Sequence, residues 1–472
     1  MQENSSIPIL KSFTKERIIL FNRFVLATED NNSFIRFTKH IIGTYPNFDE
    51  KKIEKHILFK QLFPQKPYRD IVIRQLFSKL NKAIYHYLSY CELAENTNLF
   101  NHTLLRSLAK NNYNWHTEHF LKLQLKNEKI VDSTEIDTFL FEYLNQDLYK
   151  SYLYKQSNRS KEPNLQVISD SLDLHYIINK LKIYCEAISY QTISKTEYQI
   201  RFIDEILPYL TNSGIAKNIL VQFYVSILQL LNSTSEDYSL FASYKKLLFK
   251  NYKKLDSEEF FAIYNLSKNY CIKQANLGHS NYVRELFDLY KLELELFRKH
   301  KENSFSPSSY KNIASAGLRL KEYDWTRSFI DEFEPFLPND SKKNTYNFSL
   351  ASYYFATVEY KKCIKCLANI DHTDLFVSLS ARALQARAYF ELKEIMPLES
   401  LLQSFKMFIG TKKKLGYHRT NYLNFIKFVT RLNRFRYKDF EPKHIQKLKL
   451  EIENEKNILE KKWLLEKVSE FN

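Results

Sequence analysis

The sequence predicts an all-α protein: an α-α superhelix of stacked helix pairs, preceded by a helical head without visible repeat. Nearly every segment between turn signals carries apolar residues at i, i+3, i+4 and i+7, the period of an amphipathic helix, and alternation with period two is scarce. In the range 310–408, three stretches superpose on one helix-pair pattern, since Tyr323 and Tyr360 are 37 residues apart and Tyr354 and Tyr389 are 35 apart. One such unit cannot bury its apolar face alone, so we expect the units to stack.

The composition supports a large helical core and limits other architectures. The chain has 472 residues, of which 44% are apolar and 15% aromatic, enough to fill many helix interfaces. It has only six glycines. Because left-handed turns and tight phosphate loops favour glycine, we expect almost none of either.

The sequence favours a cytoplasmic protein without a membrane span. Its first ten residues, MQENSSIPIL, lack the basic and apolar regions of a signal peptide. The longest apolar segment, Ile219–Leu231, has 13 residues, short of the roughly 20 that span a bilayer, and is predicted to be a buried core helix. The five cysteines are scattered and odd in number, which fits a reducing compartment better than a disulfide framework.

Four zones follow one another along the chain. Residues 1–160 are predicted to form the helical head, 165–300 longer helices in pairs, 301–412 the repeats, and 413–472 basic capping helices. A polar stretch, Gln156–Asn164, is the predicted linker after the head. The predicted helices of the second zone are Gly214–Asn232, Glu236–Lys253, Ser257–Ala275 and Ser280–Lys301.

The clearest helix of the head follows Pro67. One stripe of this segment is apolar, and the basic residues Arg74, Lys79 and Lys82 fall outside it. The stripe consists of Ile73, Leu76, Phe77, Leu80, Ile84, Tyr87, Leu88 and Cys91.

The middle repeat shows the helix-pair pattern most completely. Leu350 and the small Ala351 are followed by Tyr354, by the inter-helix aromatic Tyr360 and by the small Cys363. Small residues at these positions let two helices approach closely, and aromatics fill the space to the next unit. On these residues the repeat region resembles tetratricopeptide repeats, and the resemblance implies a degenerate α-solenoid.

The other repeats depart from that pattern. Gly317 stands at a tyrosine position, Ile395 where an aromatic is usual, and Leu398 at a small position, so the units are degenerate. The pair around Tyr270 and Tyr282 fits a fourth unit with a longer inter-helix turn. The whole chain, including its closing LEKKWLLEKV, also resembles uncharacterised helical proteins of Bacteroidetes.

The tetratricopeptide resemblance implies a peptide-binding groove lined by the first helix of each unit. Cations and aromatics alternate at the corresponding positions and could hold an acidic or amphipathic segment. The clamp that binds a C-terminal carboxylate in this family requires asparagine where Ser315 stands, so that ligand is not expected. The alternative is that these side chains pack on neighbouring units. The groove positions are Lys311, Ser315, Arg319, Ser352, Phe355, Arg387 and Phe390.

A second candidate surface lies in the basic tail. The chain carries a net charge of +16, and the range 412–449 holds twelve Lys and Arg against two acidic residues. In a helix over 417–435, Lys427, Arg431 and Arg434 fall on one face beside several aromatics. Such a stripe can bind phosphates and stack unpaired bases. It can equally be a solvated face, or contact acidic proteins or a membrane surface.

Motifs for nucleotide binding are not found. The segment TKKKL between Gly410 and Gly416 is followed by Tyr417, so it lacks both the spacing and the Lys-Ser/Thr ending of a phosphate loop. No G-x-G-x-x-G can be written. We expect no cofactor.

Two short patterns suggest metal ligands, and both are interpreted as structural. Cys363 and Cys366 form C-x-x-C with His372 beyond them, but they fall on a second helix of the repeats, where Cys363 fills the small packing position. His116 and His119 do not match H-E-x-x-H and have no third ligand in view. We expect no metal site.

Together these observations favour a non-enzymatic scaffold or adaptor that binds a segment of a partner protein on a helical-repeat groove. The alternative is a nucleic-acid- or ribosome-associated helical protein acting through its basic C-terminal helices. A third hypothesis is an enzyme whose site cannot be recognised in sequence.

Overall fold

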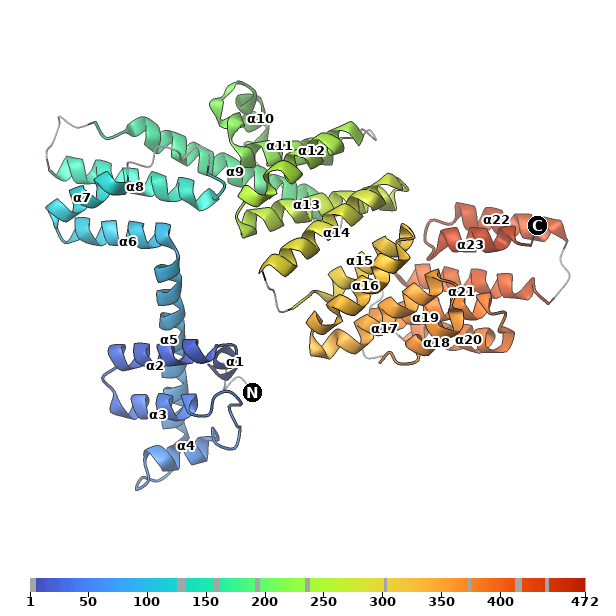
Figure 1. Cartoon of the computed structure of the whole chain (residues 1–472), viewed down its shortest axis with the longest axis horizontal. Helices are drawn as coiled ribbons and strands as arrows, with labels where there is room; N and C mark the ends of the chain where they lie inside the picture. Colours follow the sequence, from blue (N-terminus) through green and yellow to red (C-terminus); the bar gives the residue numbers. More distant parts are fainter. Residues whose placement is uncertain are drawn as a thin grey trace. The chain divides into compact units, whose positions relative to one another are not determined.

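The computed structural model describes residues 6–124, 133–156, 162–191, 196–233, 238–300, 304–371, 375–411, 418–437 and 441–471. Within these ranges the chain is all-α, with helices α1 to α23 and no strand (Figure 1). Consecutive helices pack in pairs, so the predicted all-α, helical-repeat-like fold is confirmed. Two compact units are distinguished, Met1–Phe260 and Phe261–Asn472, and each is described by itself.

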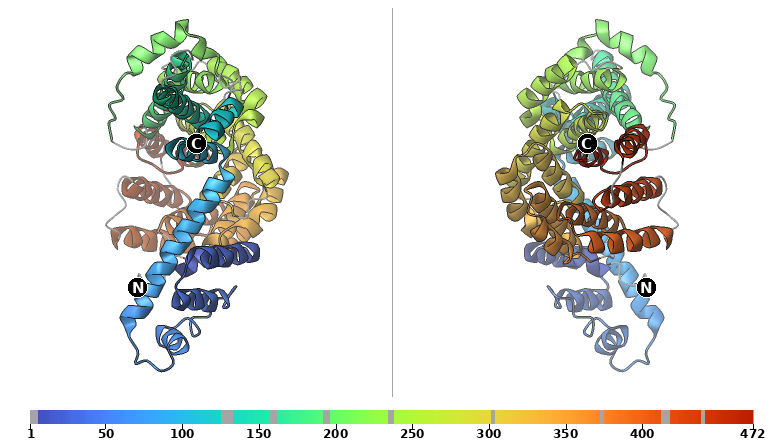
Figure 2. Two further views of the ribbon diagram at one scale, coloured as in Figure 1. Left: turned by 90° about the vertical axis from the view of Figure 1, so that its left-hand side faces the viewer. Right: turned by 90° about the vertical axis from the view of Figure 1, so that its right-hand side faces the viewer.

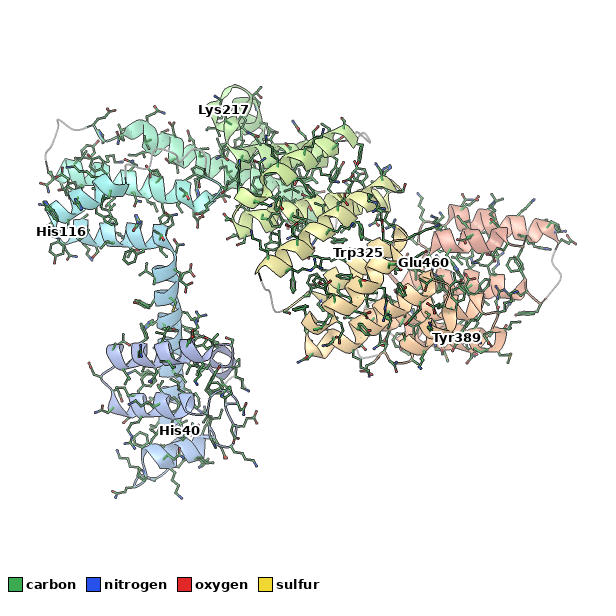
Figure 3. The ribbon with its side chains drawn as sticks, viewed as in Figure 1. His40, His116, Lys217, Trp325, Tyr389 and Glu460 are labelled. Atoms are coloured by element: carbon green, nitrogen blue, oxygen red, sulfur yellow. The ribbon has the colours of Figure 1, made fainter. Side chains whose placement is uncertain are left out.

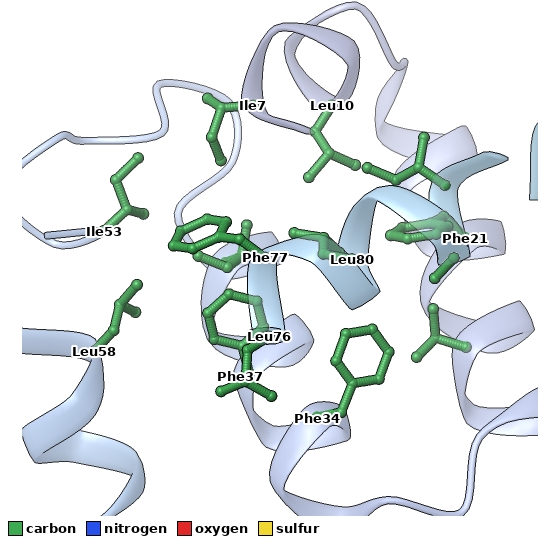
Figure 4. Packing of buried hydrophobic residues seen from close by; sticks show 14 of the residues in the cluster. Ile7, Leu10, Phe21, Phe34, Phe37, Ile53, Leu58, Leu76, Phe77 and Leu80 are labelled. Carbon is green, nitrogen blue, oxygen red and sulfur yellow. The ribbon is translucent and has the colours of Figure 1, made fainter. Parts of the chain in front are cut away.

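The head of unit 1 packs four short helices along the first part of a long one, α5 (Figures 1 and 2). Phe21, Phe34, Phe37 and Leu80 meet in its core (Figure 4). The apolar stripe predicted after Pro67 is the buried face of α5, with only Leu88 and Cys91 partly exposed. The helices of the head are α1 (Ser6–Lys11), α2 (Lys15–Thr28), α3 (Asn32–Ile42), α4 (Lys55–Leu62) and α5 (Asp70–Glu95).

Asn96 joins the head helix α5 to the next helix, α6. Its N–H donates to Glu92 O at 2.9 Å and closes α5, while its Oδ1 accepts from Leu99 N at 2.9 Å and begins α6. Asn96 thus makes a capping hydrogen bond at the end of α5 and another at the start of α6, so the turn between them does not require a glycine.

The remaining helices of unit 1 pack mainly on α8, α9 and α11. The predicted core segment Ile219–Leu231 forms most of α11, and Leu220, Phe223 and Tyr224 in it are fully or almost fully buried. The predicted linker is only partly assessed, because residues 157–161 lie outside the described ranges. The helices are α6 (Thr97–Lys110), α7 (Asn114–Gln124), α8 (Ile136–Lys155), α9 (Leu165–Gln191), α10 (Ile203–Asn212), α11 (Ile219–Asn232), α12 (Tyr238–Asn251) and the start of α13 (Ser257–Asn276).

Unit 2 continues as helix pairs in the register predicted from the repeats. Its first pair is α13 with α14 (Asn281–His300), and Tyr270 and Tyr282 of this pair are in ring contact at 5.7 Å. The three predicted repeat units follow as α15 (Pro307–Arg319) with α16 (Tyr323–Phe333), α17 (Asn339–Ala356) with α18 (Tyr360–Leu367), and α19 (Leu375–Glu391) with α20 (Ile395–Thr411).

The three repeats share one inter-helix turn, and it is left-handed. Lys321, Val358 and Lys393 stand at equivalent positions with φ of 60°, 64° and 60°. In each turn the following glutamate donates its N–H to the carbonyl five residues earlier, at 2.9, 2.8 and 3.0 Å, which is a Schellman motif. The pairs α13–α14 and α6–α7 turn the same way at Gly278 and Asn112.

This repeated turn corrects the expectation that few glycines allow almost no left-handed turns. Among the described residues, eight positions other than glycine have positive φ. The backbone hydrogen bonds of the motif hold lysine, valine and asparagine in the left-handed region, so glycine is favoured there without being required.

Three C-terminal helices cover the last repeat. Phe405, Phe425, Trp463 and Leu464 belong to one core cluster that joins α19 and α20 to these helices. They are α21 (His418–Arg434), α22 (Pro442–Asn454) and α23 (Lys461–Ser469). The finer division of the chain into four zones stays a prediction.

Candidate functional site

A cavity of about 680 Å³ lies along the first helices of the repeats in unit 2. On α15, Lys311, Ser315 and Arg319 are spaced four residues apart and therefore share one face, which lines the cavity. Phe355 on α17 and Arg387 on α19 line it as well. The structure therefore brings six of the seven predicted groove positions together, Ser352 included.

Phe390 is the exception, and its prediction as an exposed groove residue is wrong. Its side chain is fully buried. Trp463 lies edge-on at 5.3 Å between ring centroids, and the Arg436 guanidinium covers the ring at 3.7 Å and donates to the Phe390 carbonyl. The physical reason is that the C-terminal helices cover the last turn of α19, a contact that the repeat pattern alone does not contain.

Arg387 is the most enclosed charge of the cavity. Its guanidinium carbon lies 4.2 Å from the Phe355 ring centroid and 5.4 Å from that of Trp463, and its Nη1 is 2.9 Å from Glu460 Oε1. Burial lowers the pKa of Arg387, while the nearby Glu460 and Glu391 carboxylates act in the opposite direction. An arginine this close to a carboxylate stays charged, so the pair is an ion pair between two aromatic rings.

Residues at the start of α23 also contribute to the lining of the cavity. Leu459, Glu460 and Lys462, at the start of α23, line it together with the repeat helices. Glu460, labelled in Figure 3, has φ of 56° and ψ of 38°, a left-handed conformation that costs a side-chain-bearing residue about 1–2 kcal/mol. Sequence reasoning missed this contribution, because Glu460 is distant in sequence from the repeats.

The charge of the cavity is unbalanced. Its lining contains the cations Lys311, Arg319, Arg387 and Lys462, and within the described part of the chain Glu460 is its only acidic residue. Glu460 is paired with Arg387, and no ion pair is found for the other three cations among the described residues.

Two polar atoms of the lining also lack hydrogen-bond partners among the described residues, Ser349 Oγ and Arg387 Nε. Both are inaccessible to solvent, and a buried polar group without a partner costs about 1–3 kcal/mol. The cavity therefore combines unmatched positive charge with unmet hydrogen-bonding capacity.

The predicted basic patch on α21 is only partly a free surface. Lys427 and Arg434 are exposed as expected. Arg431 is not free, because it donates to the Glu451 carboxylate of α22 through both terminal guanidinium nitrogens, Nη1 and Nη2, and Arg436 is half-buried over Phe390. Of the twelve basic residues counted in the range 412–449, Lys412, Lys413, Lys414 and Lys438 lie outside the described residues.

Unit 1 contains a second cavity, of about 640 Å³, with the opposite charge. Among the described residues, its lining carries seven carboxylates and one cation, Lys182, whose Nζ is paired with the buried Glu259. Sequence reasoning missed it because several separate helices contribute to it. The carboxylates are Glu92, Glu95, Glu135, Asp137, Asp256, Glu258 and Glu259.

The Cys363–Cys366 pair and the His116–His119 pair both make packing contacts with neighbouring side chains. Cys363 is fully buried in the core between α17, α18 and α19, and burial raises the pKa of its thiol to about 12. His116 and His119 both contact the exposed Trp115 ring. No group of three or more metal-binding side chains is found among the described residues, and His372 is not among them.

None of the described helices is both long enough and apolar enough to cross a bilayer. The chain matches no protein-family model, and no curated protein or solved structure is significantly similar to it. The class that the structure defines is therefore a broad one, an all-α protein of helical-repeat type.

Proposed function

We propose that this protein is a non-enzymatic cytoplasmic adaptor that captures a segment of a partner protein in the groove of unit 2. The groove is the cavity lined by the first helices α15, α17 and α19 and by the start of α23. The supporting observation is that side chains selected only for their first-helix positions, among them Lys311, Arg319 and Phe355, lie around one cavity.

The repeat geometry supports the same proposal. Three helix pairs with identical turns place successive first helices side by side, as in tetratricopeptide repeats. Such a surface presents several helices to one extended or helical peptide. We therefore also propose that these units are degenerate tetratricopeptide repeats. We propose further that the whole chain resembles helical proteins of Bacteroidetes.

The test blocks the groove without removing any core contact. Ser315 is exposed on α15 and lines the cavity, so Ser315→Trp fills it with an indole. Ser328→Trp, at an exposed position on α16 outside the cavity lining, makes the same change on the second helix. The tagged proteins are used to capture partners from a lysate of the source cell.

We expect a stoichiometric partner with the wild-type protein and with Ser328→Trp, and loss of that partner with Ser315→Trp. Equal capture by both tryptophan variants would contradict the proposal. Phe390→Ala is unsuitable for this experiment, because the Phe390 ring belongs to the core and its removal would destabilise unit 2.

Nucleic-acid or ribosome binding through the C-terminal helices remains the alternative function. The exposed Lys427 and Arg434 support it, whereas Arg431 is already paired with Glu451. The same capture with and without nuclease separates the two functions. Charge reversal at Lys427 and Arg434 should then abolish a nuclease-sensitive association, and the binding should weaken steeply with salt.

A further inference from the structure

A short segment of the chain that precedes α23 lines the groove beside the repeat helices. Leu459 and Glu460 line the cavity beside the repeat helices, and the Glu460 carboxylate forms the 2.9 Å ion pair with Arg387. An apolar residue followed by an acid therefore forms part of a lining whose other charges, among the described residues, are positive.

This segment is held under local strain. Glu460 is in the left-handed region without glycine, and its side chain makes no capping hydrogen bond to α23, which begins at the next residue. Non-glycine residues in this conformation persist where other contacts determine them, and such sites are enriched at ligand clamps and switches. Among the described residues, the ion-pair partner of the Glu460 side chain is Arg387.

The rest of the groove has unused capacity for acidic groups. Lys311, Arg319 and Lys462 have no ion-pair partner among the described residues, and Ser349 Oγ has no hydrogen-bond partner there. Glu460 thus neutralises one cation of four. Charge complementarity favours an incoming segment that carries several carboxylates.

We propose that the groove binds a protein segment in which acidic residues alternate with apolar ones, and that Glu460 is an internal competitor. When the segment binds, one of its carboxylates takes the place of the Glu460 carboxylate at Arg387. This inference rests on the proposed function and adds to it the chemistry of the partner and a self-blocking step.

The exchange explains why Arg387 can stay enclosed before a partner arrives. Removing one partner of a buried ion pair leaves an uncompensated charge and is strongly unfavourable. Here a carboxylate accompanies Arg387 in both states, first from Glu460 and then from the partner. About a third of the Glu460 side chain is already exposed. After its release from Arg387, the Glu460 carboxylate becomes hydrated.

The test uses two synthetic probes and two matched variants of the full chain. The probes are fluorescein-labelled hexapeptides, blocked at both ends, in which Leu alternates with Glu or with Gln. Glu460→Gln removes the competing charge, and Glu453→Gln removes one charge at an exposed residue outside the cavity lining. Arg319→Gln removes an exposed cation of the groove. Fluorescence anisotropy gives Kd.

We expect the wild-type protein to prefer the Leu-Glu probe, and Glu460→Gln to bind that probe about tenfold more tightly, a change of one decade in Kd. Glu453→Gln should leave Kd unchanged, and Arg319→Gln should weaken binding. An unchanged or larger Kd for Glu460→Gln would overturn the internal competitor. If neither the wild-type protein nor Glu460→Gln binds the Leu-Glu probe at concentrations up to about 1 mM, the proposal of an acidic ligand is overturned.

These outcomes are distinguishable from failure of the adaptor function itself. If Ser315→Trp loses the natural partner while Glu460→Gln gains nothing, the groove binds proteins and only the inference about Glu460 and acidic segments is wrong. If Ser315→Trp keeps the partner, the adaptor function is wrong. Circular dichroism and urea unfolding of each variant check that the chain remains folded.

Discussion

Gly317 on α15 faces Thr326 on α16 so closely that a Cβ built on Gly317 would stand 2.2 Å from Thr326 Oγ1 and 3.4 Å from the Phe287 ring. Thr326 is itself fully buried, and its hydroxyl donates to Glu322 O at 2.7 Å. The tyrosine expected at this repeat position is absent because the neighbouring helices already occupy the space. The departure from the repeat pattern is therefore a packing requirement of the first unit.

Gly317→Ala should destabilise unit 2, against the usual effect of this change in a helix. Alanine normally gains about 0.5–1 kcal/mol over glycine in a helix interior. Overpacking costs about 1–3 kcal/mol, and the Thr326 hydroxyl cannot move without breaking its hydrogen bond. We expect a net loss of about 1–2 kcal/mol in the free energy of urea unfolding.

Gly410→Ala on α20 is the matched control, because a methyl group added at Gly410 would meet no heavy atom of the described residues within 4 Å. This variant should gain up to about 1 kcal/mol. In a Thr326→Ala background, Gly317→Ala should cost much less, since the clashing oxygen is gone. Equal stability changes at Gly317 and Gly410 would contradict the packing argument.

The left-handed turn of the second repeat offers a stabilising substitution. Val358 has φ of 64° and is 68% exposed, so glycine there relieves the backbone without removing buried contacts. Val358→Gly should raise the free energy of unfolding by about 1 kcal/mol. Thr357→Gly, one residue earlier at φ of −91°, is the control and should lower it, because the Thr357 hydroxyl bonds to Tyr353 O at 3.1 Å. Urea unfolding measures both.

The sequence was sufficient to place the repeat helices but not their turns. Apolar periodicity and the tyrosine spacing locate both helices of each unit, because packing repeats along the chain. The turn at Lys321, Val358 and Lys393 is defined by main-chain hydrogen bonds, which leave no signature in side-chain type. A rule based on glycine content therefore underestimates left-handed turns in this chain.

The candidate groove was likewise only partly predictable. Lys311, Arg319 and Arg387 could be assigned because first-helix positions follow from the repeat. Phe390 and Glu460 could not, because their surroundings come from helices beyond the repeats that meet α19 only in the folded chain. Long-range contacts of this kind are invisible to periodicity in one sequence.

Thiol reactivity should divide the cysteines by burial. Cys185 and Cys363 are fully buried, and burial raises the pKa of each thiol to about 12, whereas Cys91 is only partly buried. At about pH 8 iodoacetamide should label Cys91 in the native protein and reach Cys185 and Cys363 only after urea is added. Peptide mass spectrometry gives the labelled sites.

The same pKa shifts predict how alkali affects stability. Below about pH 9 both thiols are protonated in the folded and unfolded chains, and their contribution to stability is complete. Between about pH 9 and about pH 12 the unfolded thiols ionise first, so stability falls as the pH rises. Rapid labelling of Cys363 in the native protein would contradict its place in the repeat core.

Acid should weaken the contact between α21 and α22. The hydrogen bond from Arg431 holds the pKa of Glu451 below its ordinary value, so the pair stabilises the folded chain above that ordinary value. Stability is lost as the pH falls through the lowered pKa of the folded state. Glu451→Gln should flatten the loss between about pH 5 and about pH 3, measured as the urea midpoint. Glu453→Gln should keep the wild-type slope.

The most costly single change that we predict in unit 1 breaks the buried ion pair between Lys182 and Glu259. Glu259 is 4% exposed, its Oε1 lies 2.5 Å from Lys182 Nζ, and its Oε2 accepts from Tyr224 OH at 2.6 Å. Lys182→Met leaves this carboxylate buried without its cation, and such losses cost about 3–5 kcal/mol. Tyr224→Phe, which removes one hydrogen bond and keeps the charge balance, should cost about 1–3 kcal/mol.

A double variant separates the buried charge from simple loss of packing. Lys182→Met with Glu259→Gln removes both charges, so it should be more stable than Lys182→Met alone although it carries one more substitution. Lys246→Met, at an exposed lysine of α12 in the same unit, should change the free energy of unfolding by less than about 0.5 kcal/mol. If the double variant were as unstable as the sum of its single changes, the loss would come from packing around Lys182, and not from the ion pair between Lys182 and Glu259.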